Sequence, residues 1–64
     1  MSHPIIIQAV IDNDYNKVKQ LLDSGVDVNS VDMYLTTPLH MAIMLKRDSI
    51  KKLLLSYGGT LKGI

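Results

Sequence analysis

The six residues Thr37-Pro38-Leu39-His40-Met41-Ala42 carry the clearest local structural signal in this sequence. A threonine side chain can accept a hydrogen bond from one of the free N–H groups in the first turn of a helix. A proline in the next position already has the backbone angle of a helix, and its missing N–H removes no helical hydrogen bond. The stretch therefore predicts a helix that begins at Pro38, with Thr37 as its N-cap.

An internal repeat of 33 residues relates this stretch to the start of the chain. Shifting the sequence against itself by that distance gives five identities over 31 aligned positions, where chance gives roughly two. The identities are Ala9 with Ala42, Lys19 with Lys52, Leu21 and Leu22 with Leu54 and Leu55, and Gly25 with Gly58. A small residue, a leucine pair and a glycine each have a structural role in a helix, and this strengthens the case for a repeat.

Each unit contains two apolar segments separated by three polar residues. The first segments cover residues 5–11 and 39–45, and the second segments end in Leu-Leu-x-x-Gly at Gly25 and Gly58. A glycine is the usual residue just beyond a helix because, without a Cβ, it adopts the left-handed conformation at little cost. The pattern predicts an all-α fold of two antiparallel helical hairpins.

The run Ile5-Ile6-Ile7 has a second interpretation as a β-strand, because β-branched residues favour a pleated surface. Periodicity cannot separate the two structures over so short a run. We prefer a helix because Ala9 has the same place in its unit as Ala42, which follows the capped helix start.

The chain is long enough for one domain only. We place the first unit at about residues 4–31 and the second, incomplete, at about residues 32–64. A chain of this size buries only ~60% of the surface that its unfolded form exposes. The sequence has no Trp, Phe or Cys, so its core must be aliphatic and has no disulfide.

The stretch from Thr37 to Ala42 resembles the signature of the ankyrin-repeat family, which contains T-P-L-H-x-A in a unit of 33 residues. Asp27-Val28-Asn29, followed by Asp32, is similar to the family's loop into the next repeat. The resemblance covers residues 5–58, and it implies helical hairpins stacked in a solenoid. Such hairpins bury their apolar faces against neighbours, and normally three or more are required. We therefore expect a marginally stable or partly molten monomer that can self-associate through its unsatisfied ends.

Three positions depart from the family pattern. Leu35 stands where the family usually has a glycine in the β-turn before Thr37, and this puts the ordinary turn in doubt because a leucine at positive φ is costly. Lys46 replaces the usual glycine between the two helices of the second unit. Asn13 has the equivalent place in the first unit, and asparagine tolerates positive φ better than most residues.

The resemblance also implies a surface for a protein partner. Ankyrin-repeat proteins bind through the tips of their β-turns and the concave side of each first helix. The corresponding residues are Met33, Tyr34 and Thr36 in the turn, with Met44 and Leu45 on the helix. These residues are apolar for a surface, and exposed apolar patches tend to mark interaction sites. The alternative is that some of these side chains cover the thin core.

No arrangement of residues predicts catalysis, a cofactor or a metal site. The resemblance implies a structural role for His40, through hydrogen bonds near Thr37, and no activating partner is visible in the sequence. We expect His3 to be exposed near the chain start. The six aspartates stand near predicted helix ends and loops, where a carboxylate caps N–H groups.

Charge and hydropathy exclude other kinds of partner. The net charge is +1, and Lys46-Arg47 with Lys51-Lys52 is too thin a basic patch to predict nucleic-acid binding. We interpret these four residues as solvated helix faces. No run approaches the ~20 apolar residues of a membrane span. The sequence predicts a cytoplasmic protein.

Two functions fit these observations. The first is a non-catalytic protein-binding module, and the alternative is a truncated remnant of a longer ankyrin-repeat protein with little autonomous function. The abundance of Ile, Asn, Lys, Asp and Tyr is similar to that of the ankyrin-repeat proteins of poxviruses, which act on host proteins. This compositional resemblance implies a viral source and, with it, the host cytoplasm.

Overall fold

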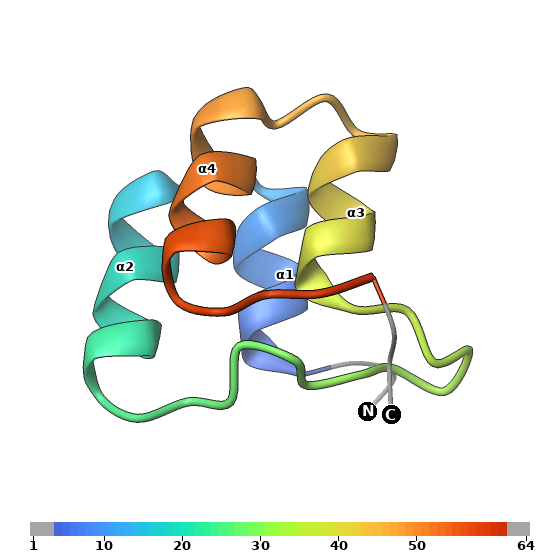
Figure 1. The fold of residues 1–64 in the computed structure, drawn as a ribbon, viewed down its shortest axis with the longest axis horizontal. Coiled ribbons are helices and arrows are strands. Elements are labelled where there is room, and N and C mark those ends of the chain that lie inside the picture. Colours follow the sequence, from blue (N-terminus) through green and yellow to red (C-terminus); the bar gives the residue numbers. More distant parts are fainter. Residues whose placement is uncertain (1–3, 62–64) are drawn as a thin grey trace.

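The computed structural model describes residues 4–61, and this range contains four helices and no strand. The helices are α1 (Ile5–Ile11), α2 (Tyr15–Asp23), α3 (Pro38–Met44) and α4 (Asp48–Ser56). Helices α1 and α2 form one antiparallel hairpin, and α3 and α4 form the second (Figure 1). The all-α prediction is confirmed, and Ile5-Ile6-Ile7 is helical. The first hairpin falls within the first predicted unit and the second within the second, whose residues 62–64 lie outside the described range.

Side-chain hydrogen bonds cap the first turn of two of the helices, as local sequence rules predict. Thr37 Oγ1 accepts a hydrogen bond from the His40 N–H at 3.2 Å, so the predicted N-cap of α3 is confirmed. Asp14 caps α2 in the same way, through the Lys17 N–H at 3.1 Å. At α1, Pro4 is the N-cap residue and makes no capping side-chain bond. Ser2 and His3 lie outside the described residues, so the expectation that His3 is exposed is not tested.

All four helices end in the same way. The second residue beyond each helix has a positive φ: Asn13 (56°), Gly25 (100°), Lys46 (58°) and Gly58 (86°). The N–H groups of this residue and the next donate to carbonyl oxygens in the last helical turn, as the Arg47 N–H does to the Ala42 oxygen at 2.8 Å. These bonds satisfy carbonyl groups that a helix end leaves free. The predicted roles of Gly25 and Gly58 are confirmed.

The helices pack in two layers. Helix α1 lies beside α3 in one layer, and α2 lies beside α4 in the other (Figure 1). The longest of these helices has nine residues, whereas a span of the membrane core requires about 20. Within residues 4–61, no helix is therefore long and apolar enough to cross a membrane.

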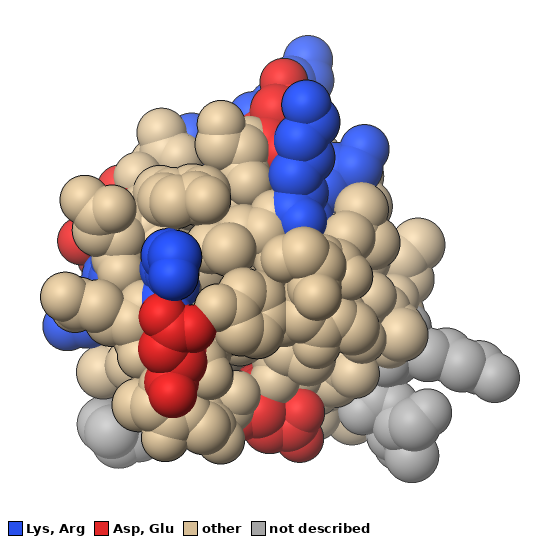
Figure 2. All heavy atoms as spheres, turned by 60° about the vertical axis from the view of Figure 1, so that its left-hand side comes forward, with Lys and Arg blue, Asp and Glu red and all other residues tan. Residues whose placement is uncertain are grey.

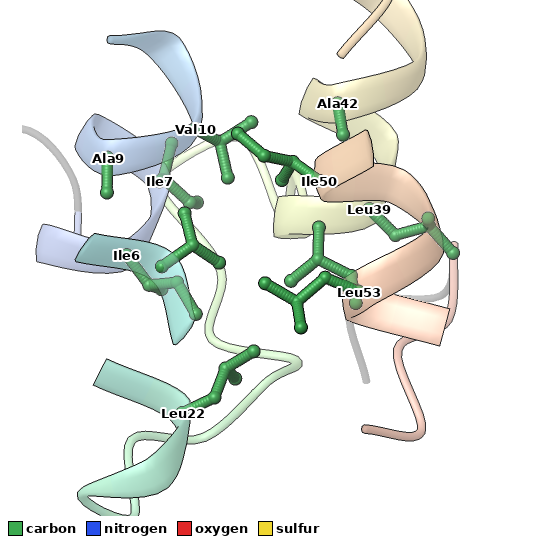
Figure 3. Packing of buried hydrophobic residues seen from close by; sticks show 11 residues of the cluster. Ile6, Ile7, Ala9, Val10, Leu22, Leu39, Ala42, Ile50 and Leu53 are labelled. Carbon is green, nitrogen blue, oxygen red and sulfur yellow. The ribbon is translucent and has the colours of Figure 1, made fainter. Parts of the chain in front are cut away.

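The core lies between the two hairpins and is entirely aliphatic. Side chains of α1 and α2 point toward those of α3 and α4 across it (Figure 3). The buried cluster consists of Ile6, Ile7, Ala9, Val10, Val18, Leu22, Leu39, Ala42, Ile50, Leu53 and Leu54. Because each hairpin contributes about half of this cluster, neither has a closed core without the other.

Candidate protein-binding surface

The loop before α3 is a tight turn that one carboxylate organises. Oδ1 of Asp32 accepts hydrogen bonds from the backbone N–H groups of Tyr34, at 2.8 Å, and Thr36, at 3.0 Å. The Leu35 N–H donates to the Asp32 carbonyl at 3.0 Å. An aspartate that bonds to backbone groups just beyond it in this way is a common stabiliser of turns. The loop is therefore a defined projection on the surface.

Leu35 adopts φ 61°, in the left-handed region. The sequence put the ordinary turn in doubt at Leu35, but the leucine takes the backbone conformation that a glycine would take there. A leucine prefers other backbone angles by roughly 1–2 kcal/mol. The hydrogen bonds to Asp32 on both sides of Leu35 hold it in this conformation.

The tip of the turn presents its apolar side chains to solvent. Met33 and Tyr34 are 72% and 79% exposed, which makes them the most exposed large apolar residues of the described chain. Thr36 is half-buried beside the turn's hydrogen bonds. Neither Met33 nor Tyr34 belongs to the buried cluster or packs against it.

Met44 and Leu45 are also exposed, at the opposite end of α3. Seven helical residues span about 10 Å, so the length of α3 separates these two residues from the turn. His40 is exposed between the two ends, one helical turn before Met44. We call Met33, Tyr34, Thr36, Met44 and Leu45 the binding strip.

His40 contributes to the structure through its backbone. Its N–H donates to Thr37 Oγ1, which agrees with the expected hydrogen bond near that residue. The imidazole itself is exposed and makes no hydrogen bond with residues 4–61. The structural role of the histidine side chain stays a prediction, while the main chain of His40 makes the capping bond.

Arg47 joins the two hairpins, a contact that the sequence did not predict. Its Nη2 donates to the Ile11 carbonyl at 2.8 Å, and its Nε donates to the Val10 carbonyl at 3.3 Å. Both carbonyls lie in the last turn of α1, where a cation is favoured by the helix dipole. The interpretation of Arg47 as part of a solvated face is wrong, since its side chain is half-buried in this contact.

Two further side chains connect the hairpins. Oδ1 of Asn29 accepts a hydrogen bond from the Thr60 N–H at 2.9 Å, and its Nδ2 approaches the Gly58 carbonyl at 3.5 Å. The Tyr57 hydroxyl donates to the Asp23 carboxylate, which Lys19 also contacts at 3.0 Å. These contacts tie the loop after α2 and the end of α2 to the chain after α4.

The Asp23 contacts change the protonation behaviour of exposed groups. The hydrogen bond from Tyr57, followed by that from Lys19, lowers the pKa of the Asp23 carboxyl below its ordinary value of 3.8. The same hydrogen bond, aided by desolvation, raises the pKa of Tyr57 above 10.0. The contact with Asp23 likewise raises the pKa of Lys19 above 10.5. All three groups belong to a surface link and stand apart from the binding strip.

The described residues contain no obvious chemical centre. Among residues 4–61, no three His, Asp, Glu or Cys side chains form a group that could hold a metal ion. A shallow hollow between α2 and α4 is lined by Tyr15, Ser49, Lys52 and Leu53. On the face shown in Figure 2, acidic and basic side chains stand next to one another and leave a broad uncharged area.

Comparison with known proteins assigns the family. Residues 2–62 match the family model described as ankyrin repeats (3 copies). The 2-5A-dependent ribonuclease of Mus musculus is 44% identical over 54 residues, and that of Homo sapiens is 40% identical over 55 residues. These alignments cover 83% and 84% of this chain but only 7% of each ribonuclease. No solved structure matches the chain. The chain belongs to the ankyrin-repeat family.

Proposed function

We propose that this chain is a non-catalytic protein-binding module that contacts its partner through the binding strip. The observation that carries the proposal is the turn of residues 32–36, which holds Met33 and Tyr34 out into solvent on a hydrogen-bonded frame. Large apolar side chains in such a position are unfavourable in water unless a partner covers them. Tyrosine and methionine are also enriched in the contact regions of protein interfaces.

The geometry favours a partner with two apolar contact points. The tip of the turn offers Met33 and Tyr34, while the far end of α3 offers Met44 and Leu45, about 10 Å away by helix length. Membership in a family whose repeats typically bind proteins supports the same conclusion. A viral source with host targets is a finer proposal that rests on composition, and both relatives named above are mammalian.

Capture of a partner by the purified chain tests this function. Replacing both Tyr34 and Leu45 by Ser is expected to abolish capture of the partner that the unchanged chain retains from a cell extract. Both side chains are exposed, so the circular dichroism spectrum should not change. Leu55→Ser is the control, because Leu55 is a leucine on α4 that is more exposed than Leu45 (50% against 37%) and lies outside the binding strip. Unaltered capture by the double variant would refute the proposal.

Thermal unfolding distinguishes this module from a decayed remnant. A binding module needs a folded frame, so we expect a cooperative melt of the purified 64-residue chain. A featureless melt would favour the remnant, whose turn would then not hold Met33 and Tyr34 in place.

A further inference from the structure

The hollow between α2 and α4 lies where both helices begin. The two helices lie side by side and start at the same end of the molecule (Figure 1). Tyr15, Ser49, Lys52 and Leu53 line the hollow, whose volume is about 450 Å³. Sites for small molecules typically have volumes of roughly 300–1,000 Å³. The hollow shares no residue with the binding strip, so a ligand bound there would go beyond the proposed function.

A short side chain on α4 leaves this space. Ser49, Lys52 and Leu53 lie on one side of α4, because residues three and four apart are neighbours on a helix. Leu53 is buried and forms an apolar floor. Lys52 and Tyr15, the first residue of α2, are exposed beside it. Ser49 is too small to fill the gap between them.

Lys52 brings a positive charge without a counter-charge. Its equivalent in the first hairpin, 33 residues earlier, is Lys19, which pairs with Asp23 at 3.0 Å. The equivalent of Asp23 is Ser56, whose hydroxyl donates to the Leu53 carbonyl at 2.6 Å. Within residues 4–61, Lys52 therefore makes no ion pair. None of the four residues that line the hollow is acidic.

The hydroxyl of Ser49 is also available to a ligand. Ser24 and Ser56 stand at helix ends, and each donates to the carbonyl oxygen three residues earlier. Ser49 is the second residue of α4, so no earlier turn of its own helix offers it such a carbonyl. Neither its hydroxyl nor that of Tyr15 makes a hydrogen bond with residues 4–61. The hollow thus combines an ammonium and two hydroxyl groups with an apolar floor.

This combination selects the chemistry of the ligand. A flat ring on Leu53 would cover apolar surface and contact the ring of Tyr15 in one of the geometries that aromatic pairs prefer. The ammonium and hydroxyl groups can donate to carboxylate oxygens. One ammonium balances one negative charge, which favours a carboxylate over a doubly charged phosphate.

We propose that the hollow binds a small aromatic carboxylate. Its ring lies on Leu53 beside Tyr15, and its carboxylate bonds to the ammonium of Lys52 and the hydroxyl of Ser49.

Titration of the whole chain with 2-naphthoate, followed by the NMR signals of backbone amides, tests the proposal. We expect a dissociation constant of about 1 mM, as suits a ligand of this size. The shifting amides should be those of the four residues that line the hollow. The neutral 2-naphthamide supplies the same ring without the charge and should bind about fivefold more weakly. Acetate supplies the charge without the ring and should cause no comparable shift.

The charge is assigned by two neighbouring lysines. Lys52→Met keeps the apolar stem and should weaken naphthoate binding about fivefold, while binding of the neutral amide stays unchanged. Lys51→Met is the matched control, because Lys51 is exposed, changes the net charge equally and does not line the hollow. Equal weakening by both variants would reduce the effect of Lys52 to general charge attraction and overturn its assignment.

The ring contact is assigned by two exposed tyrosines. Tyr15→Ser should weaken the binding of naphthoate and of naphthamide alike by about fivefold, since both lose the same aromatic contact. Tyr34→Ser is the control, because Tyr34 is exposed at the tip of the turn and away from the hollow. A larger effect of the Tyr34 variant would place the ring on the binding strip and overturn the proposal.

Filling the hollow gives the last test. Ser49→Leu puts a larger side chain into the space and should abolish the binding of both ring probes, while a dispersed amide spectrum shows that the chain stays folded. Undiminished binding by this variant would overturn the site. So would the absence of any shift in the unchanged chain at about ten times the expected dissociation constant. These measurements involve no protein partner, so their outcome is independent of partner capture.

Discussion

At the scale of single residues, Leu35 and Lys46 share a backbone conformation that suits glycine best. Both have φ near 60° and both are exposed, so burial of the side chain does not offset the cost of this backbone conformation at either position. The two positions differ in surroundings. Hydrogen bonds to Asp32 surround Leu35 at the tip of the turn, whereas Lys46 lies between α3 and α4.

We predict that Leu35→Gly and Lys46→Gly each raise the free energy of unfolding by about 0.5–1 kcal/mol. Glycine relieves the strained φ, and this gain exceeds the greater freedom that it gives to the unfolded chain. Urea unfolding followed by circular dichroism measures both values. Gly58→Ala should act in the opposite direction, since Gly58 has φ 86°. A loss of stability in Leu35→Gly would show that the leucine side chain contributes packing that outweighs the strain.

At the scale of elements, Arg47 secures the end of α1 to the turn between α3 and α4. Replacing it by Met keeps an unbranched apolar stem but removes both hydrogen bonds to the Val10 and Ile11 carbonyls. We expect a loss of about 1–2 kcal/mol in the free energy of unfolding, because hydrogen bonds from a half-exposed charged group contribute about this much to stability. Lys52→Met is the control on an exposed position of α4 and should change little. Equal effects of the two variants in urea unfolding would contradict the role given to Arg47.

The contact between Asp23 and Tyr57 joins α2 to the end of α4 and predicts a dependence on pH. The folded pKa of Asp23 is lowered, so its contribution is present above the ordinary value of 3.8 and is lost as the pH falls through the lower folded value. The folded pKa of Tyr57 is raised, so its contribution is complete below 10.0 and is lost as the pH rises through the higher folded value. The link should therefore stabilise the fold between these limits.

Tyrosinate absorbance measures this link directly. Asp23→Ala should lower the pKa of Tyr57, so that tyrosinate forms at a lower pH than in the unchanged chain. Asp12→Ala is the control, because Asp12 accepts its hydrogen bond from Gln8 within the first hairpin. An identical titration of the Asp23 variant and the unchanged chain would mean that the hydroxyl of Tyr57 does not bond to Asp23 in solution.

At the scale of the whole molecule, the core joins two hairpins that have no closed core separately. A chain of this length has a free energy of unfolding of roughly 3–10 kcal/mol. Truncating one fully buried leucine costs about 2–5 kcal/mol, a large part of that total. Both hairpins should therefore unfold together when either loses a core side chain.

The adjacent leucines of α4 provide a matched test of this. Leu54 is fully buried and Leu55 is half exposed. We predict that Leu54→Ala lowers the free energy of unfolding of both hairpins together by about 2–5 kcal/mol, while Leu55→Ala costs less than about 1 kcal/mol. Hydrogen exchange of amides in both hairpins reads out the result. Protection retained in the first hairpin of the Leu54 variant would show that the hairpins fold independently.

The sequence alone determined the repeat, the helical hairpins and most helix ends. Thr37, Pro38, Gly25 and Gly58 act on groups within a few residues of themselves, so their roles can be predicted from local rules. The same holds for Asp14, which caps α2 from the position just before it.

Only the tertiary structure decided which copy of a repeated residue is buried. Leu22 and Leu55 are the same residue at the same place in two hairpins, yet Leu22 is buried and Leu55 is half exposed. The physical reason is that burial depends on the neighbouring hairpin. The described structure places such a neighbour against the first hairpin, and against the near side only of the second. The bonds of Arg47 to α1 have the same origin, because they join residues more than 35 positions apart.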